Sequence, residues 1–393
     1  MITISLCLIV KDEEDVLARC VDSVKAAVDE IVIVDTGSTD ATRSIAAAYT
    51  KCVYDFEWIE DFAAARNYAF SKATSAYILW LDADDVLLEQ DLQKLLALKS
   101  SLSSDVDTVS MDYHLSKDEY GTVTSALRRN RLVKRSRGFR WIGAVHEYLE
   151  VYGVSFASDI AVTHASLRHD SDRNLRIYEQ RLAKGESFGP RDLYYYANEL
   201  NDHARYEQAI IYYSRFLLSG EGWVEDNIAA CGKMSDCYSA LGAVDLALEY
   251  ALRSFKYGSP RPEFCCRIGY WHLQRGAHAT AAYWYEAALT TPKPEQSWSL
   301  QNNSCSTWLP HLQLCVCYDK LGDYARAFVH NERAREYRPE DASVLHNKAY
   351  LEGVLRPMLD ERMAAEAEPA EAEPVEAEQA SRPEKMAEQE VPL

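Results

Sequence analysis

The sequence of 393 residues contains no apolar run near the roughly 18 residues that a membrane-spanning helix needs. Its first apolar run, residues 2–10, is followed at once by the charged residues Lys11 to Glu14, which does not fit a cleavable secretion signal. Zinc-site spacing is also missing among the ten cysteines, because Cys265-Cys266 and Cys315-Val316-Cys317 are not zinc-binding patterns. We therefore expect a cytoplasmic protein with reduced cysteines and no transmembrane segment.

Positive charge is scarce in this chain. The 42 Lys and Arg residues stand against 61 Asp and Glu, which gives a net charge of -19. This balance argues against a nucleic acid or an anionic membrane as the main partner, because both repel an acidic surface. The hydrophobic content of 48% is ample for buried cores. At this length we expect two domains rather than one.

Strands and helices alternate along the first 85 residues. Apolar, β-branched runs typical of buried strands occur at residues 3–10, 30–35, 52–56 and 76–81. Helical patterns separate them at residues 13–28, about 40–49 and 61–73. This alternation predicts a Rossmann-like α/β sheet. Short β-like segments between residues 107 and 165 predict a mixed or antiparallel extension of that sheet.

From about residue 174 to residue 355 the chain is helical and repetitive. Four segments share one frame, a small residue followed by Ala five positions later: 204–209, 242–247, 276–281 and 322–327. Their starts are 38, 34 and 46 residues apart, and the longest step implies an insertion near residues 292–308. The 34-residue step resembles tetratricopeptide repeats, which form concave surfaces for peptides and proteins.

These patterns place three parts along the chain. We expect an α/β domain at residues 1–170, an all-α helical repeat domain at 174–355 and a disordered acidic tail at 356–393. The tail is rich in Glu, Ala and Pro and has almost no aromatic residues, so it cannot bury a core. A transient helix at residues 361–368 is the one exception that the pattern allows.

The most informative stretch is residues 78–85 (ILWLDADD), in which an apolar strand ends in three carboxylates. Strands of parallel sheets deliver such residues to the edge where α/β folds bind ligands. Clustered carboxylates repel one another unless a cation lies between them, and Asp82 and Asp84 can share a hard divalent ion. The stretch therefore predicts a metal site that in turn holds a phosphate.

Four motifs in order resemble those of family 2 glycosyltransferases, which have the GT-A fold. They are residues 6–14 (LCLIVKDEE), 32–42 (VIVDTGSTDAT), 61–67 (DFAAARN) and 81–85 (LDADD). With helical repeats behind them, they resemble the bacterial two-domain subgroup that includes the peptide S-glycosyltransferases of glycocin biosynthesis. The resemblance implies a GT-A domain, a UDP-sugar donor, a bound Mg²⁺ or Mn²⁺ ion and transfer with inversion.

The same resemblance assigns residues to the donor. Asp35 accepts from the uracil or a ribose hydroxyl, Arg66 reaches the nucleotide or its diphosphate, and Asn67 contacts the nucleotide as well. The alternative for Asp35 is a cap of the following helix, and for Asn67 a role in tying loops together. For Arg66 the alternative is an ion pair with Asp61 or Glu60 on the helix surface.

The resemblance also gives the two acids of the DxD pair different partners, the ribose and the metal ion. Asp82 belongs to the ribose and Asp84 to the metal, with Asp85 in a supporting position. His164 ends the segment 160–164 and is the expected further metal ligand. The alternatives are a strand end with solvated acids and a lone histidine that closes a strand.

Inversion requires a base that takes the proton of the acceptor as UDP leaves. The candidates lie in residues 143–147 (GAVHE), where Glu147 is the first choice and His146 the alternative. This departs from the common pattern of the family, in which the base belongs to a Glu-Asp pair. Whether these two residues serve the acceptor or the metal stays open at this level.

Two further features flank the predicted site. Residues 128–140 (RRNRLVKRSRGFR) hold seven basic residues, which fit either a mobile arm over the diphosphate or the solvated face of a strand pair. Trp58 and Trp141 have the aromatic surface to stack on a sugar or base, although core packing is the more frequent role of such residues.

The chain is thus predicted to be an inverting, metal-dependent transferase. It would move a hexose or N-acetylhexosamine from a UDP-sugar to a peptide or protein side chain that the repeats bind. The first alternative is an acceptor that is a glycan, a lipid-linked saccharide or a small molecule, with the repeats as an assembly module. The second is a non-catalytic scaffold, against which the intact acids argue. Self-association into a homo-oligomer stays open.

Overall fold

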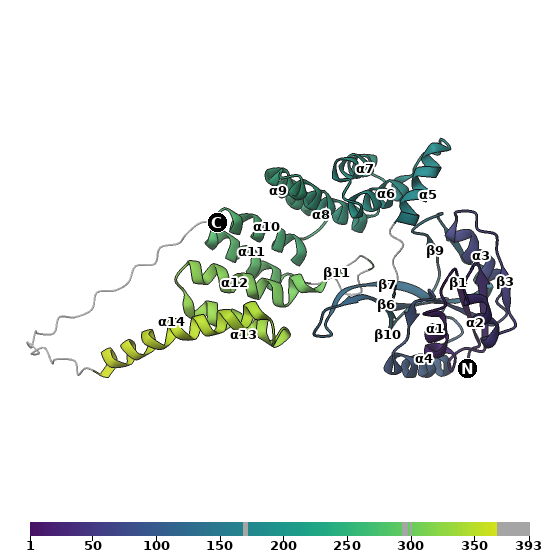
Figure 1. Cartoon of the computed structure of the whole chain (residues 1–393), viewed down its shortest axis with the longest axis horizontal. Helices are drawn as coiled ribbons and strands as arrows, with labels where there is room; N and C mark the ends of the chain where they lie inside the picture. The colour runs from purple at the N-terminus through teal and green to yellow at the C-terminus, as the bar shows by residue number, and fades with distance from the viewer. Residues whose placement is uncertain (168–171, 293–297, 299–300, 368–393) are drawn as a thin grey trace, which may run out of the picture.

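The computed structural model of this protein describes residues 1–167, 172–292, 298 and 301–367, which form two regions (Figure 1). The N-terminal region is an α/β domain built on one large sheet. From α5 (Asp172–Ala183) to α14 (Ala342–Ala367) the chain is mostly helical. These helices form an arc that begins next to the α/β domain at α5 and α6 and moves away from it toward α14. The predicted order of an α/β sheet domain before helical repeats is therefore confirmed.

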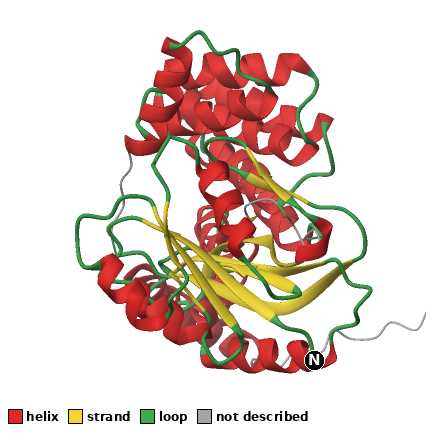
Figure 2. Cartoon of the chain, turned by 90° about the vertical axis from the view of Figure 1, so that its right-hand side faces the viewer, coloured by secondary structure: helices red, strands yellow, loops and turns green. Residues whose placement is uncertain are grey.

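The parallel half of the sheet has the order β3-β2-β1-β4. Its strands are β1 (Ile4–Val10), β2 (Glu30–Asp35), β3 (Val53–Asp55) and β4 (Tyr77–Trp80). The connecting helices are α1 (Leu17–Val24), α2 (Thr42–Tyr49) and α3 (Phe62–Lys72). Helices α1 and α2 pack on one face of the sheet and α3 on the other, so most residues of β1, β2 and β4 are buried, whereas the edge strand β3 is partly exposed (Figure 2). Burial on both sides explains why the predicted strands appear as continuous apolar runs.

The other half of the sheet is mixed, as the segments after residue 107 predicted. Strand β7 (Val123–Lys134) runs antiparallel to β4 and to β6 (Thr108–Lys117), and β10 (Ser155–His164) runs parallel to β6. Strands β8 (Arg140–Ile142) and β9 (Tyr148–Glu150) form a separate pair. The pattern did not predict helix α4 (Glu89–Ser101) or the two-residue strand β5 (Asp85–Val86), which runs antiparallel to β10.

Helical hairpins make up most of the second region. Within the described residues they are α6 (Pro190–Asp202) with α7 (Tyr206–Ser219), α8 (Val224–Ala240) with α9 (Val244–Arg253), α10 (Pro262–Gln274) with α11 (His278–Thr290), and α12 (Trp308–Lys320) with α13 (Tyr324–Tyr337). Each of the four sequence frames spans the turn inside one hairpin. The repeat read from the sequence is therefore a repeat of structure, of the tetratricopeptide-like kind.

The residue types of the frame follow from this position. The first residue of each frame has a positive φ, at Ala204 (57°), Gly242 (75°), Gly276 (70°) and Gly322 (76°). Glycine adopts this conformation at no steric cost, and it commonly ends helices in this way. The alanines five positions later are buried on the second helix of each hairpin, at Ala209, Ala247, Ala281 and Ala327. A small side chain there lets the helices approach closely.

The insertion predicted near residues 292–308 makes a second contact between the two regions. It contains β11 (Gln301–Asn302), which pairs with Ser125 and Ala126 of β7. Next to it, the Asn303 side chain donates a hydrogen bond to the backbone oxygen of Val123 (3.0 Å). The arc of helices is therefore attached to the sheet at α5 and α6 and again at the β6–β7 hairpin.

The C-terminal part differs from the expected disordered tail at 356–393. Helix α14 continues through Pro357 to Ala367, because Ala, Glu and Leu are good helix formers and outweigh one lost hydrogen bond. Residues 368–393, the rest of the predicted tail, lie outside the described residues. In the described part of the chain, no helix has both the length and the apolar character that crossing a bilayer requires.

Candidate active site

A cavity of about 1390 Å³ lies between the edge of the sheet and the first helices of the repeat region. The sheet side contributes Asp82, Asp84 and His164 to its lining. The repeat side contributes residues of α5 and α6, among them Arg191 and Glu199. The volume exceeds that of an ordinary small-molecule pocket, so the cavity has room for two substrates at once.

The turn after β4 carries the predicted acid cluster into this cavity. The backbone N–H of Asp82 donates to Asp85 Oδ2 (3.0 Å), and the backbone N–H of Asp85 donates to the oxygen of Asp82 (3.0 Å). Strand β5 then pairs with β10 in a register that sets Asp85 opposite His164. Beside this pair, the backbone N–H of Ala165 donates to the oxygen of Asp84 (2.9 Å). A short strand that the sequence did not predict therefore brings together acids and histidine far apart in the chain.

Asp84, Asp85 and His164 form a group that fits a divalent cation. One ligand atom from each lies within 4.8 Å of the others, and His164 Nδ1 is 3.6 Å from Asp84 Oδ1. Asp85 Oδ1 is buried and has no hydrogen-bond partner among the described residues, so this oxygen is left to bind a cation. Two carboxylates and an imidazole are suitable ligands for Mn²⁺ or Mg²⁺. The structure brings the predicted ligands Asp84 and His164 together and adds Asp85 to them, while Asp82 lies outside this group.

The pKa shifts at this group reflect crowding of negative charge. Burial and the neighbouring carboxylates raise the pKa of Asp84, although the charge of His164 opposes the shift. The close contact with Asp85 raises the pKa of His164 against the effect of burial, and the charges of the acids add to that rise. A bound cation would relieve the repulsion that causes the first of these shifts.

Arg131 supplies the fixed positive charge behind the acids. Its side chain is 0% exposed, and Nη1 lies 3.0 Å from Asp85 Oδ2 and 3.4 Å from the backbone oxygen of Trp80. The guanidinium also packs over the rings of Trp80 and Tyr113, at 4.0 and 4.4 Å from their centres. Arg131 belongs to the basic run 128–140, so this part of the run is neither a mobile arm nor a solvated face: it lies in β7, under the acid turn.

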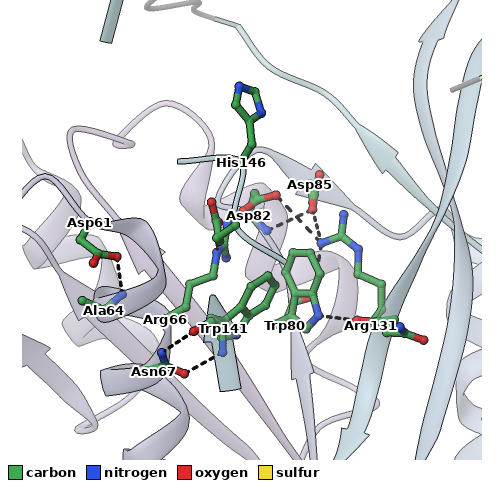
Figure 3. A network of polar contacts seen from close by, with 12 residues as sticks. Asp61, Ala64, Arg66, Asn67, Trp80, Asp82, Asp85, Arg131, Trp141 and His146 are labelled. Atoms are coloured by element: carbon green, nitrogen blue, oxygen red, sulfur yellow. Dashed lines mark hydrogen bonds and ion pairs between the residues drawn. The ribbon is translucent and has the colours of Figure 1, made fainter. Parts of the chain in front are cut away.

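Arg66 joins Asp82 to Glu147, the first choice for the predicted base. Its Nη2 donates to Asp82 Oδ1 and its Nε to Glu147 Oε1, each at 2.6 Å, as Figure 3 shows for the contact with Asp82. The guanidinium also lies close to the rings of Trp80 and Trp141, at 5.1 and 4.9 Å from the ring centres. Burial alone would raise the pKa of Asp82, but the charges of the neighbouring arginines outweigh it and lower that pKa to about 2. Arg66 is therefore buried between two carboxylates. It makes no ion pair with Asp61 or Glu60, the partners expected if Arg66 lay on the helix surface.

Asn67 and Asp35 do not line the cavity. Both polar atoms of Asn67 pair with the backbone of Trp141, each at 2.9 Å, so the side chain ties α3 to β8 (Figure 3). Asp35 is buried at the end of β2, where Oδ1 accepts from the backbone N–H of Ser38 (3.1 Å) and from its hydroxyl (2.5 Å). Its neighbour Thr36 does line the cavity. The structure thus places Asp35 beside the cavity wall.

The two candidates for the base face different ways. Glu147 points toward Arg66, and its second oxygen makes no hydrogen bond with the described residues. The ring of His146 points away from Arg66 and Asp82 (Figure 3). His146 Nε2 lies 2.6 Å from Glu199 Oε1, on helix α6 of the repeat region.

Several cavity residues were not among those predicted. Glu13 lies in the first motif, 6–14, and burial together with the charge of Asp84 raises its pKa to about 7. Arg191 and Glu199 of α6 also line the cavity, but their helical spacing gives no sign of contact with the α/β domain. The motif could have indicated Glu13, whereas only the docking of the two regions identifies the residues of α6.

The two tryptophans take different positions. Trp141 is buried with its ring edge-on to Trp80 at 4.7 Å between centres, and it also lines the cavity. Trp58 packs against Phe62 at 4.8 Å and reaches the same cavity from the loop before α3. Packing and access to the cavity are therefore combined in both residues.

Known proteins share parts of this chain. Residues 5–150 match the model of glycosyl transferase family 2. A TPR repeat-containing protein of Synechococcus elongatus is 36% identical over 150 residues, which cover 38% of this chain and 36% of that protein. The SPbeta prophage-derived glycosyltransferase SunS of Bacillus subtilis is 29% identical over 229 residues, 53% of this chain and 52% of that protein. The chain thus spans about half or less of the length of these relatives.

Among solved structures, glucosyl-3-phosphoglycerate synthase of Mycobacterium tuberculosis, in complex with Mn²⁺, UDP and phosphoglyceric acid, overlaps 28% of this chain and 43% of that chain. The identity is 21% and the TM-score 0.25, so this partial overlap carries no conclusion here. Residues 5–150 of this chain thus match glycosyl transferase family 2, and a tetratricopeptide-like repeat region follows them.

Proposed function

We propose that this protein is an inverting, metal-dependent glycosyltransferase that moves a hexose or N-acetylhexosamine from a UDP-sugar to a peptide or protein side chain. The observation that carries the proposal is the cavity between a family 2 domain and the repeats, lined by Asp84 and His164 on one side and by helix α6 on the other. The resemblance of the motifs to the subgroup with peptide S-glycosyltransferases supports a peptide acceptor.

The donor is held by charges that the fold fixes in place. Asp84, Asp85 and His164 would hold the divalent ion, which supplies positive charge to the diphosphate as it leaves. Asp82 accepts from the ribose hydroxyls with its orientation set by Arg66. Asp35 lies beside the cavity wall at the end of β2, so its contact with the nucleotide stays a prediction from the resemblance, and Asn67 keeps Trp141 close to the guanidinium of Arg66.

Glu147 takes the proton of the acceptor. Its Oε1 is held by Arg66, which leaves Oε2 for the hydroxyl or thiol that attacks. The acceptor atom forms a bond to the anomeric carbon on the face opposite the diphosphate. The bond from that carbon to the diphosphate oxygen breaks, its electron pair stays on the diphosphate, and the proton ends on Glu147. A single displacement of this kind inverts the anomeric centre.

Incubation with a panel of UDP- and GDP-sugars tests the donor. We expect release of UDP from one or a few UDP-sugars in the presence of Mn²⁺ or Mg²⁺, and loss of that release in EDTA. Synthetic peptides that differ only in carrying Cys, Ser, Thr or Asn then identify the acceptor atom by the added sugar mass. Absence of nucleotide release with every donor, together with no UDP binding in calorimetry, would remove the proposal and leave a non-catalytic scaffold.

A saccharide acceptor is the second candidate. One relative, the lipopolysaccharide core biosynthesis glycosyltransferase LpsC of Rhizobium meliloti, is 28% identical over 142 residues, 34% of this chain and 52% of that protein. Sugar transfer to oligosaccharides but to none of the peptides would favour this candidate and would give the repeats a role in assembly.

A further inference from the structure

The loop that carries the proposed base has a strained backbone. Within residues 143–147, Gly143 has a φ of 100° and His146 a φ of 50°. A residue other than glycine rarely adopts a positive φ, because its Cβ then crowds the backbone. The conformation at His146 therefore requires contacts that hold it, and they come from the repeat region.

One residue of the loop belongs to the core of the repeats. Val145 is 3% exposed and is part of a hydrophobic cluster whose other members, among them Tyr178, Leu193 and Tyr194, lie on α5, α6 and later helices. On the opposite side of the chain, the backbone oxygen of Ala144 accepts from the N–H of Phe62 at the start of α3 (2.9 Å). Burial of the Val145 side chain thus attaches the loop to the repeat region, although the loop itself belongs to the α/β domain.

Helix α6 also holds His146 through three of its own side chains. Glu199 Oε1 lies 2.6 Å from His146 Nε2, and the ring of Tyr195 stacks on the imidazole at 4.4 Å between centres. Arg191 donates to the backbone oxygen of His146 from Nη2 (2.8 Å) and Nε (3.2 Å). The positions 191, 195 and 199 are four residues apart, so all three side chains lie on one face of α6.

The contact with Glu199 is charged and buried. Glu199 is 7% exposed and accepts a further hydrogen bond from Asn174 (3.2 Å). Burial alone would raise the pKa of this carboxyl, but the hydrogen bonds from His146 and Asn174 and the nearby histidines together outweigh it and lower the pKa. A buried carboxylate with two donors has a defined geometry, because moving it would leave its charge unpaired.

The next residue in the chain is Glu147, which points the other way to Arg66. Successive residues of the loop therefore contact opposite walls of the cavity. Because the backbone at 146 is fixed by α6, the direction of the side chain at 147 is fixed as well.

Resting on the function proposed above, we propose that Arg191, Tyr195 and Glu199 of α6 are positioning residues that set the proton-accepting carboxylate of Glu147. The repeat region is then a working part of the acceptor side of the site, in addition to any role in binding the acceptor. None of the three residues touches the donor cluster, so they act on the chemical step through the loop 143–147.

The test is a set of variants of the full chain, measured as kcat for transfer and KM for the donor. We expect Glu199→Ala to lower kcat by about 10- to 100-fold with little change in donor KM, because small displacements of a catalytic group have effects of this size. Glu199→Gln, which keeps an oxygen acceptor for His146, should restore most of the activity. Glu207→Gln, an exposed carboxylate at the start of α7, is the matched control and should behave like the unmodified protein.

A double variant shows whether Glu199 acts through Glu147. In a Glu147→Gln background, Glu199→Ala should reduce kcat no further, because there is no carboxylate left to position. Equal losses in both backgrounds, or full activity of Glu199→Ala, would overturn the proposal.

Hydrogen exchange gives a measurement that needs no turnover. Backbone amides of residues 143–148 should exchange faster in Glu199→Ala than in the unmodified protein, while those of residues 78–86 stay unchanged. If the exchange at 143–148 does not change, the positioning role is wrong whatever the activity. If Glu199→Ala shows the faster exchange but the unmodified protein transfers no sugar, the proposed function fails and the structural coupling stands.

Discussion

The acid turn at residues 82–85 and the loop at 143–147 face the same cavity, but different forces hold them in place. The acids follow β4 and are fixed by backbone pairing of β5 with β10 and by the buried charge of Arg131. The loop has no strand partner at His146 and depends on side chains of a helix from the other region. One side of the cavity is thus built within a single sheet, and the other exists only where two regions meet.

This difference separates the two halves of the proposed reaction. Backbone register is insensitive to most side-chain changes, so the donor side should tolerate changes in the repeats. The acceptor side should respond to them, because its loop is fastened by Val145 and by residues of α6. Substitutions on each side therefore measure whether the two halves are independent.

The largest effect is expected at the metal group. Asp84→Asn removes a ligand charge and should lower sugar transfer by about 10³-fold or more, because the charge on the leaving diphosphate is no longer compensated. Calorimetry should show the loss of Mn²⁺-dependent UDP binding. Asp22→Asn, an exposed carboxylate on α1, is the control and should leave both properties unchanged. Normal transfer by Asp84→Asn would contradict the metal assignment.

The next largest effect is on stability. Arg131→Met leaves Asp85 at 0% exposure without its ion partner and should lower the free energy of unfolding by about 3 kcal/mol. Urea unfolding followed by circular dichroism measures this difference. Arg135→Met, at an exposed position next to the same strand, should cost less than about 1 kcal/mol. Equal stability of the two variants would mean that the acids do not depend on the buried arginine.

A smaller effect is expected where the loop enters the repeat core. Val145→Ala should lower stability by about 2 kcal/mol, through lost apolar burial and the small cavity left behind. UDP binding should stay unchanged, because no donor residue moves. Val154→Ala, at a valine that is 53% exposed, should have almost no effect. A loss of UDP binding in Val145→Ala would show that the two sides are coupled after all.

The smallest effect depends on pH and belongs to Glu13. Its pKa of about 7 lies above the usual value for a glutamate, so the folded state keeps the proton longer than the unfolded state. Stability should therefore fall as the pH rises from about 4.5 to about 7, and the loss should persist above that range. Because water screens a half-exposed group, Glu13→Gln should recover only about 1 kcal/mol at pH 8 and nothing at pH 4.5.

Thermal unfolding in EDTA at the two pH values measures this difference. Glu57→Gln, at an exposed position outside the cavity, is the control and should show no pH-dependent gain. A similar gain for Glu13→Gln at both pH values would exclude titration as its cause.

The sequence predicted the first strands and the repeats well, because both have strong periodic signals. The parallel strands β1, β2 and β4 are apolar on both faces, and the frame that starts at Gly242, Gly276 and Gly322 has a positive φ at its first residue. Strand β5 has only two residues and helix α4 follows without a distinct cap, so neither produced a usable pattern. The helical end of the chain extended past residue 356, because composition alone does not fix where a helix ends.

Sequence alone determined the order of the two regions, the position of the acids at the end of β4 and the identity of Asp84 and His164 as candidate ligands. The order of the regions and the place of the acids rest on local patterns, which follow from the period of strands and helices, whereas the two ligands were assigned by the resemblance of the motifs to family 2 glycosyltransferases. Only the tertiary structure decided that Asp85 joins the ligands, that Arg131 lies beneath them and that Glu199 of the repeats holds the loop before Glu147. Such contacts join residues far apart in the chain, and docking of apolar surfaces, which has no sequence period, brings them together.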